Sequence, residues 1–396
     1  MSASDDIVIV SGTRTAVGRF GGGFKDLPAP RLGAVAIKEA IRRAKLEPRD
    51  VDHVVMGCTL QIADTINVAR QAAIYAGVPV EVPAFTVNRL CGSGVEAIHS
   101  AARMVATGDA EVVVAGGVEN MSRMPYILRN ARWGYRMGDG VLEDSMAAGV
   151  LQCPINDYHM GVTAENVATK YGVNREDQDK FALESQKRAV AAIKGGLFKE
   201  QIVPVHIPQS KGEAVTVDTD EHPRADTTLE KLAKLTPAFK QGGTVTAGNS
   251  SGLNDGAAAV VVMSRRTAQE KGLEPLLTLR GRAVAGVDPA YMGIGPAQAV
   301  PRAMKRAGLR VQDMDLIELN EAFAAQAVAV MRELNMDSAR TNVNGGAIAL
   351  GHPLGATGAV LVVKLMYEMA RRHSRYGLVT ACIGGGMGIA SIFERA

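Results

Sequence analysis

The sequence predicts an α/β protein made of two βαβ half-domains that pack face to face, with a large insertion in the first half. Short apolar runs alternate with helical patterns over residues 7–117, and a similar plan returns over residues 343–382. The stretch between them, from about 122 to 250, is more polar and lacks this alternation. Alternating strands and helices are typical of parallel βαβ units.

In the first half, apolar runs bounded by turn residues predict strands, and longer periodic runs predict helices. The expected strands are 7–10, 54–56, 85–87 and 111–117, and the expected helices are 32–44, 69–76 and 95–107. Gly108 ends the last of these helices.

The second half is expected to contain a strand at 316–319, a helix that follows the Gly-rich turn 351–358 and runs to about 372, and a strand at 377–382. The insertion is expected to contain one helix, 163–194. If the halves are duplicates, each brings one Gly-rich turn to their interface, and α/β proteins tend to place ligands in such a crevice. The predicted bounds are 1–121 plus 252–273 for the first half, 122–251 for the insertion and 274–396 for the second half.

The composition excludes several classes of protein. The chain has 396 residues, of which 47% are hydrophobic and 21% charged, and a net charge of only +3, which does not indicate a nucleic-acid partner. No apolar run reaches the roughly 18 residues of a membrane span. The four cysteines form no CxxC pair, which favours a reducing compartment, so we expect a cytoplasmic protein. No metal-ligand spacing and no Walker loop are present, so we expect no metal and no cofactor.

Cys91 is the first candidate for chemistry, in the segment NRLCGSG (88–94). A thiol at the start of a helix meets free backbone N–H groups and the positive end of the helix dipole, which are expected to lower its pKa. The glycines at 92 and 94 leave room for an acyl group. The competing interpretation is a small buried cysteine behind a tight turn.

Three further candidates lie at ends of predicted elements. His352, between a glycine and a proline, could act as a base or as a hydrogen-bond donor. Cys382 ends a strand and could be a general acid or base, because the reference pKa of a thiol is close to the working range. Asn320 follows a strand and, with Glu321, could equally be a helix cap.

Together these segments resemble the thiolase superfamily. NRLCGSG (88–94) is similar to its nucleophile motif, and NEAF (320–323), GHP (351–353) and CIGGG (382–386) are similar to its other catalytic blocks, in the same order. The likeness extends to SGTRTA (11–16), ARQAA (69–73) and GNSSGLNDG (248–256). It therefore covers nearly the whole chain and implies the thiolase fold.

The resemblance implies a ping-pong acyl transfer between coenzyme A (CoA) thioesters. His352 would help Cys91 become a thiolate, which forms an acyl-cysteine, and Cys382 would exchange a proton with the acetyl-CoA enolate. One oxyanion site would combine His352 with a water held by Asn320, and the other would use the N–H groups of Cys91 and Gly384. CoA is then a substrate rather than a cofactor.

The resemblance also implies the residues that contact the substrate. The positions that match CoA-binding ones are His159, Met160, Arg224, Lys231, Ala247, Ser251, Leu253, Ala322 and Phe323. Lys231 stands where relatives often have a small hydroxyl residue, which puts its contact in doubt. Met292 and Leu90 would line the acyl pocket. Family habit further implies a homotetramer, a dimer of dimers, with residues 132–137 as a contact.

Several alternatives compete with this interpretation. Ketoacyl synthases pair their cysteine with two histidines, whereas the third position here is Cys382. An acyl-CoA carrier without catalysis would not need four intact blocks, and a nucleotide-dependent oxidoreductase would need a phosphate loop that SGTR (11–14) does not supply. Within thiolases, YHMG (158–161) resembles the short-chain, acetoacetyl-CoA type, so we expect an acetyl-CoA acetyltransferase. A 3-ketoacyl-CoA thiolase of broader chain length is the alternative.

Overall fold

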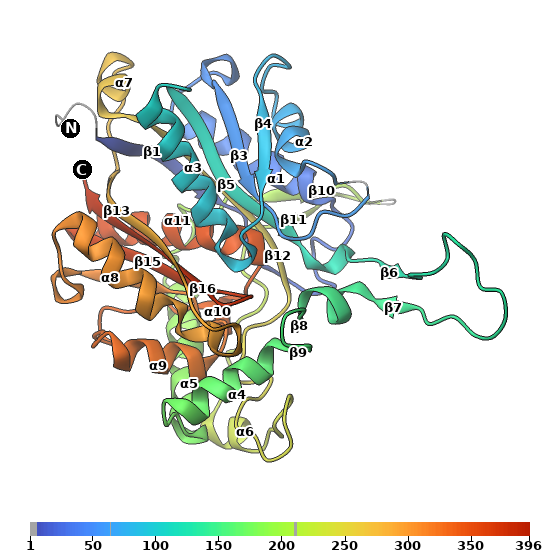
Figure 1. The fold of residues 1–396 in the computed structure, drawn as a ribbon. Coiled ribbons are helices and arrows are strands. Elements are labelled where there is room, and N and C mark those ends of the chain that lie inside the picture. The colour runs from blue at the N-terminus through green and yellow to red at the C-terminus, as the bar shows by residue number, and fades with distance from the viewer. Residues whose placement is uncertain (1–5, 64, 210–211) are drawn as a thin grey trace.

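The computed structural model describes residues 6–63, 65–209 and 212–396 and centres on one large sheet (Figure 1). Its strands run in the order β14-β15-β16-β13-β1-β12-β5-β3-β4, and β2 pairs with β12. Their bounds are β1 Ile7–Arg14, β2 Gly18–Arg19, β3 His53–Gly57, β4 Ala84–Val87, β5 Val112–Asn120, β12 Asn254–Ser264, β13 Leu277–Gly286, β14 Leu316–Leu319, β15 Tyr376–Ile383 and β16 Met387–Arg395.

The predicted α/β class is confirmed, but the sheet is mixed rather than wholly parallel. Only β3 with β4, β3 with β5, and β14 with β15 pair in parallel among the described strands. The last strand, β16, was not predicted. It follows β15 after a three-residue glycine turn and therefore returns antiparallel, as a short hairpin connection requires.

Helices from both halves accompany this sheet. They are α1 Ala29–Arg43, α2 Val68–Tyr75, α3 Ser93–Thr107, α8 Gly295–Ala307, α9 Ala324–Glu333, α10 Ala347–Leu350 and α11 Leu354–Arg372. Side chains alternate across a strand, so Val54 and Met56 of β3 join one core with α1 and α2, while Val55 joins another with α3 and α11. A third core joins the strands of the second half to α8 and α9. The strands of the two halves therefore form two layers of this one sheet. Helices α3 and α11 lie between the two layers, α1 and α2 cover the outer side of the first, and α8 and α9 cover the outer side of the second.

The middle helix layer depends on glycine. A methyl group at Gly94 of α3 would lie 2.6 Å from the amide nitrogen of Ala359 in α11, and one at Gly358 would lie 2.5 Å from that of Val95. The backbones of the two helices are therefore in direct contact near their amino ends. Cys91 shortly precedes one of these adjoining ends and His352 the other, so each half contributes one candidate residue to this contact between the helices.

The insertion between β5 and β12 contains several short elements. They are β6 Tyr126–Ile127, β7 Glu143–Asp144, β8 Gln152–Cys153, β9 Tyr158–His159, α4 Met160–Lys170, α5 Arg175–Lys194, β10 Val205–Ile207, β11 Val215–Val217 and α6 Leu229–Ala233, and α7 Arg265–Glu270 follows β12. The prediction of one helix over 163–194 was wrong. Gly172 adopts a left-handed φ of 61° and breaks it, and Asn174 caps α5 by accepting from the amide of Asp177.

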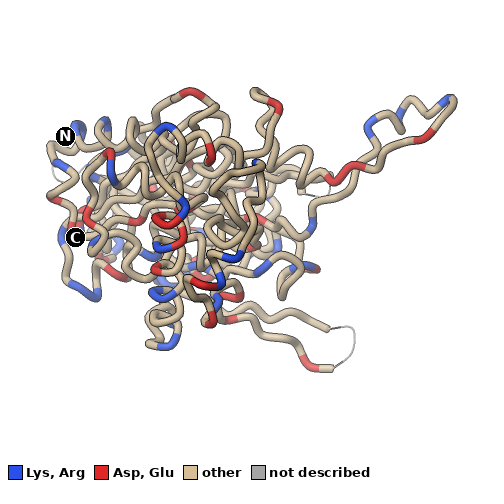
Figure 2. Tube along the Cα trace, turned by 90° about the horizontal axis from the view of Figure 1, so that it is seen from below, with Lys and Arg blue, Asp and Glu red and all other residues tan. Residues whose placement is uncertain are grey.

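Two surface features of the fold bear on its partners. The connection between β6 and β7 projects from the body as a long arm (Figure 1). Basic and acidic residues are interspersed along the chain rather than gathered in separate regions of the view in Figure 2. Among the described residues, no helix is long and apolar enough to cross a membrane.

Candidate active site

Cys91 lies in a single 3₁₀ turn, Leu90–Gly92, directly before α3. Leu90 holds an unusual left-handed backbone, with φ of 47°. Ser93 supports this turn, because its Oγ accepts from the amide of Arg89 at 2.9 Å and donates to the carbonyl of Leu90 at 2.7 Å. The Cys91 sulfur faces two backbone N–H groups, its own and that of Gly384.

Burial raises the pKa of the Cys91 thiol to about 11. The N–H groups of Gly384 and Cys91 act in the opposite direction, and the nearby Glu119 carboxylate adds to the rise. The expectation that a helix start would lower this pKa was therefore wrong, because desolvation outweighs the backbone dipoles. The resting thiol is protonated at neutral pH and needs a base to become a nucleophile.

His352 is held in one orientation by its neighbours. Its amide donates to Asn254 Oδ1 at 2.9 Å, and its Nδ1 lies 2.7 Å from Thr357 Oγ1. The Thr357 hydroxyl donates its only hydrogen to the carbonyl of Pro353 at 3.0 Å. Toward the imidazole it must therefore accept, which assigns the proton to Nδ1 and leaves a lone pair on Nε2.

The buried imidazole is neutral, because desolvation lowers the pKa of His352 to about 4. Asn320 Nδ2 approaches the free Nε2 at 3.3 Å. The Asn320 Oδ1 atom is buried and has no hydrogen-bond partner among the described residues. Such an orphaned acceptor beside a histidine lone pair is suited to hold a water.

Cys382 ends β15 and is fully buried next to Cys91. Burial, followed by the charge of a Cys91 thiolate, raises the pKa of Cys382 well above its usual range. The expectation of a pKa close to the working range was wrong for the same reason as at Cys91. Cys382 can give a proton to a strong base such as a carbanion, but it does not ionise in the resting site.

Several residues expected to contact substrate gather around these groups. Met292, Ala322 and Phe323 are buried in one apolar cluster with Cys382, and Met160 packs against it. Leu90 and Met160 also lie over Gly384, each 3.3 Å from where a Cβ on that glycine would be. The structure thus places the predicted pocket residues beside the two cysteines.

An aromatic contact extends from this cluster. His159 stacks on Phe239 with ring centroids 4.6 Å apart, and Phe239 meets Phe323 edge to face at 6.1 Å. The Ser251 amide donates to the carbonyl of Ala322 at 3.0 Å. The insertion and the second half therefore meet at the predicted CoA residues. Phe239 was not predicted, because its stretch of sequence is polar and shows no periodicity.

The remaining predicted CoA residues are not members of this apolar cluster. Leu253 packs against a separate cluster around Met121 and Met146. Arg224, Lys231 and Ala247 are exposed, and Lys231 Nζ forms an ion pair with Asp226 at 2.6 Å. Among the described residues, no group of three or more His, Cys, Asp or Glu could hold a metal.

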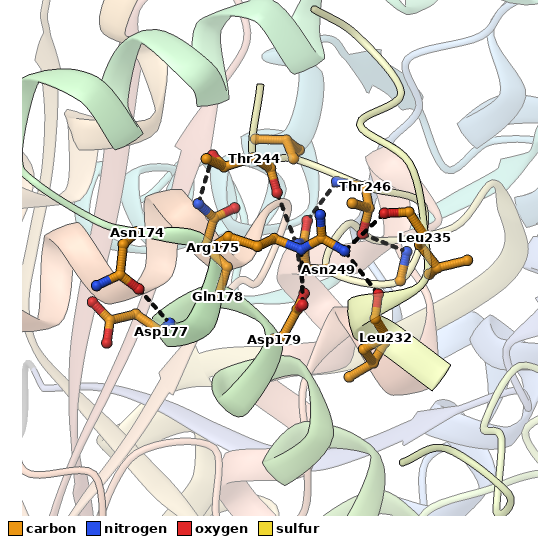
Figure 3. Close-up of polar contacts among 12 residues, drawn as sticks. Asn174, Arg175, Asp177, Gln178, Asp179, Leu232, Leu235, Thr244, Thr246 and Asn249 are labelled. Carbon is orange, nitrogen blue, oxygen red and sulfur yellow. Dashed lines mark hydrogen bonds and ion pairs between the residues drawn. The ribbon is translucent and has the colours of Figure 1, made fainter. Parts of the chain in front are cut away.

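A polar network supports the segment that carries several of these residues (Figure 3). Asp179 of α5 accepts from Arg175 Nε at 2.8 Å and from Asn249 Nδ2 at 3.0 Å. Arg175 also donates to the carbonyls of Leu232 and Leu235, at the end of α6. Asn249 Oδ1 in turn accepts from the amide of Thr246 at 2.8 Å. One buried carboxylate thus connects α5, α6 and the loop before β12.

Comparison with known proteins agrees with this architecture. Residues 7–266 match the family described as thiolase, N-terminal domain, and residues 273–395 match thiolase, C-terminal domain. An acetyl-CoA acetyltransferase of Pseudomonas aeruginosa is 55% identical over 98% of this chain and 99% of its own. The beta-ketothiolase BktB of Cupriavidus necator is also 55% identical, over the same shares.

Solved structures give the same result. The Bacillus anthracis acetyl-CoA acetyltransferase has a TM-score of 0.97 and 46% identity, and each chain is fully covered. Human mitochondrial 3-ketoacyl-CoA thiolase in complex with CoA has a TM-score of 0.96 and 45% identity, covering 100% of this chain and 99% of that one. The two α/β halves with their cysteine pair, together with the two family matches, define the class of protein. The chain belongs to the thiolase family.

Proposed function

We propose that this protein is an acetyl-CoA C-acetyltransferase, which interconverts two acetyl-CoA with acetoacetyl-CoA and CoA through an acyl-Cys91 intermediate. The observation that carries the proposal is the arrangement around Cys91. The Cys91 thiol faces two backbone N–H groups and lies next to Cys382. His352, whose Nε2 carries no proton, approaches Asn320, and the proposal takes the two pairs as one site. The identity to relatives named acetyl-CoA acetyltransferase supports the substrate.

In the cleavage direction, His352 Nε2 takes the proton of Cys91, and the thiolate attacks the ketone carbon of acetoacetyl-CoA. The carbon–carbon bond breaks, the acetyl group stays on sulfur, and the electron pair leaves as the acetyl-CoA enolate. Cys382 protonates the enolate carbon. In the second step CoA loses its thiol proton to the Cys382 thiolate and attacks acetyl-Cys91, which releases a second acetyl-CoA. His352 returns its proton to Cys91.

Two groups of donors would stabilise the developing oxyanions. The N–H groups of Cys91 and Gly384 would meet the oxygen of the carbon under attack. Protonated His352, with a water on the orphaned oxygen of Asn320, would meet the thioester oxygen of the enolate. The two groups of hydrogen-bond donors then act on two different oxygens of the same substrate. The reaction needs neither a metal nor a redox cofactor.

The chain-length preference is the finer part of the proposal. We favour the short-chain substrate, since Met160, Met292 and Phe323 fill the space around Cys382. BktB and the human mitochondrial enzyme, which carry ketothiolase and 3-ketoacyl-CoA thiolase names, are similar enough that longer chains must be assayed.

We also propose a homotetramer in the cytoplasm. Trp133 and Met137 of the β6–β7 arm are 87% and 94% exposed, and large apolar side chains in such positions mark contact surfaces. All four cysteines are free thiols, which suits a reducing compartment.

The decisive test is Cys91→Ser, which should abolish thiolysis and acyl-enzyme labelling while the melting temperature stays the same. Retained turnover would contradict the proposal. CoA-dependent cleavage rates for ketoacyl-CoAs of four to ten carbons then decide the substrate, and a maximum well above four carbons would exclude the short-chain preference.

A further inference from the structure

Glu119, at the carboxyl end of β5, is a fully buried carboxylate that the reaction described above does not use. Its Oε2 accepts from the amides of Thr59 and Gly355, at 3.0 and 2.8 Å. Its Oε1 accepts from the amide of Leu60 at 3.0 Å and faces the Cys58 thiol at 3.4 Å. Burial raises the pKa of Glu119, and the hydrogen bonds of these four neighbours oppose the rise. Three of the four are N–H groups, which can only donate, so the ionised carboxylate fits the site.

The first set of contacts leads to the nucleophile. The Thr59 hydroxyl donates to the carbonyl of Leu90 at 3.3 Å, and the Asn88 side chain donates to the carbonyl of Thr59 at 3.2 Å. Leu90 directly precedes Cys91 and holds a left-handed backbone, which is stable only where its surroundings enforce it. Glu119 therefore fixes the loop at Thr59, and this loop in turn supports the turn that carries Cys91.

The second contact leads to the base. Gly355 lies in the first turn of α11, three residues after His352. A methyl group at Gly355 would lie 2.8 Å from Cys58 Cα and 2.9 Å from Glu119 Oε2, so the first half and this turn are packed without spare room. Glu119 Oε2 thus accepts hydrogen bonds from a loop of the first half, at Thr59, and from a turn of the second half, at Gly355.

We propose that Glu119 is a positioning residue for acyl transfer: its carboxylate sets the turn that carries Cys91 and the turn that carries His352 relative to each other. This inference rests on the proposed roles of those two residues. Proton transfer between side chains requires hydrogen-bond reach, and a displacement of about 1 Å costs roughly 100-fold in rate. The contacts of Glu119 do not include the segment 247–253, so binding of CoA should not depend on it.

The test is Glu119→Gln, which keeps the shape but turns one acceptor into a donor that opposes an N–H group. We expect kcat to fall about 100-fold and KM for CoA to stay within about twofold. Asp315→Asn is the matched control. Asp315 also accepts two backbone N–H groups, those of Arg375 and Tyr376, but at the amino ends of β14 and β15, away from the site. The control should leave kcat unchanged.

A double-mutant cycle separates positioning from general damage. Thr59→Val removes only the hydroxyl that bonds Leu90, and because it acts on the same link, its loss in kcat and that of Glu119→Gln should not add. Additive losses, or a kcat of Glu119→Gln within about threefold of the parent, would overturn the inference. If Glu119→Gln does not fold, an unchanged kcat of Thr59→Val would overturn it alone.

A readout without turnover keeps this test apart from the proposed function. Iodoacetamide should label Cys91 faster at pH 8 in Glu119→Gln than in the parent, because a negative charge near the thiol is removed and its turn is released. Unchanged labelling in a folded variant would overturn the inference. A parent enzyme that labels normally but does not cleave acetoacetyl-CoA would instead contradict the proposed function.

Discussion

Thr357 Oγ1 accepts a hydrogen bond from His352 Nδ1 at 2.7 Å, because the hydroxyl hydrogen is already donated to the Pro353 carbonyl. This single acceptor decides which imidazole nitrogen is free. The free Nε2 points toward Asn320, at 3.3 Å. The neutral form and the tautomer of the proposed base thus have separate causes, burial for the first and Thr357 for the second.

Thr357→Val tests this assignment. Valine has nearly the same shape but cannot accept a hydrogen bond, so the Nδ1–H group loses its partner and the other tautomer becomes accessible. We expect kcat to fall about 100-fold, the order that general acid–base catalysis contributes. Thr357→Ser restores the hydroxyl and should recover most of the rate, measured as kcat for acetoacetyl-CoA cleavage. Equal losses in both variants would point to packing instead.

The second prediction concerns acid stability. The pKa of His352 is about 4 in the folded protein, against about 6.5 for a free histidine. Between these values the unfolded chain binds more protons, so the stability that neutral His352 provides is complete above pH 6.5 and is lost as pH falls toward 4. Chemical denaturation should therefore show a smaller acid-induced loss in His352→Asn than in the parent. An identical loss would contradict it.

A third prediction concerns the network of Figure 3. Asn249→Ala leaves Asp179 Oδ1 and the Thr246 amide unpaired, which loosens the loop that leads to Ser251. We expect KM for CoA to rise about tenfold, a loss of about 1.4 kcal/mol that is within the range for such groups, with kcat nearly unchanged. Arg332→Ala, which removes an exposed ion pair with Asp177 and a long hydrogen bond to the Gly172 carbonyl, is the control and should change neither constant. A fall in kcat alone would refute this role.

The fourth prediction concerns assembly. Trp133→Ser with Met137→Ser should lower the mass in solution from that of the proposed tetramer, measured by light scattering, because the apolar tip of the arm is removed. Val215→Ser, which is 49% exposed on β11 outside the arm, is the matched control. A monomeric mass for the parent protein would end the tetramer proposal.

Much of the fold follows from local patterns, and the exceptions have physical causes. The elements around Cys91 and His352 were predicted because periodicity and glycine positions are local signals. The strands β12, β13 and β16 and the break at Gly172 were missed. Pairing direction depends on the partner strand, and a single glycine within a long periodic run is a weak signal.

The candidate site, like the fold, was predicted where the signal is local and missed where it is not. Cys91, His352, Cys382 and Asn320 were singled out from their motifs, and the structure places Cys91 next to Cys382 and Asn320 next to His352. The pKa shift of Cys91 was predicted with the wrong sign and that of Cys382 was not predicted, because burial depends on the second half of the chain. Glu119, Thr357 and Phe239 were missed, since their importance rests on partners 60 or more residues away or on a turn whose geometry the sequence does not reveal.

The glycine contact between α3 and α11 has a consequence for how substrates reach the site. Near the amino ends of the two helices backbone lies directly against backbone, and strand pairing continues across the two halves from β1 to β13. The two halves should therefore move as one rigid body. Access to the cysteines must then come from motion in the insertion or from the threading of a slender substrate, and the catalytic distances stay constant through the whole cycle.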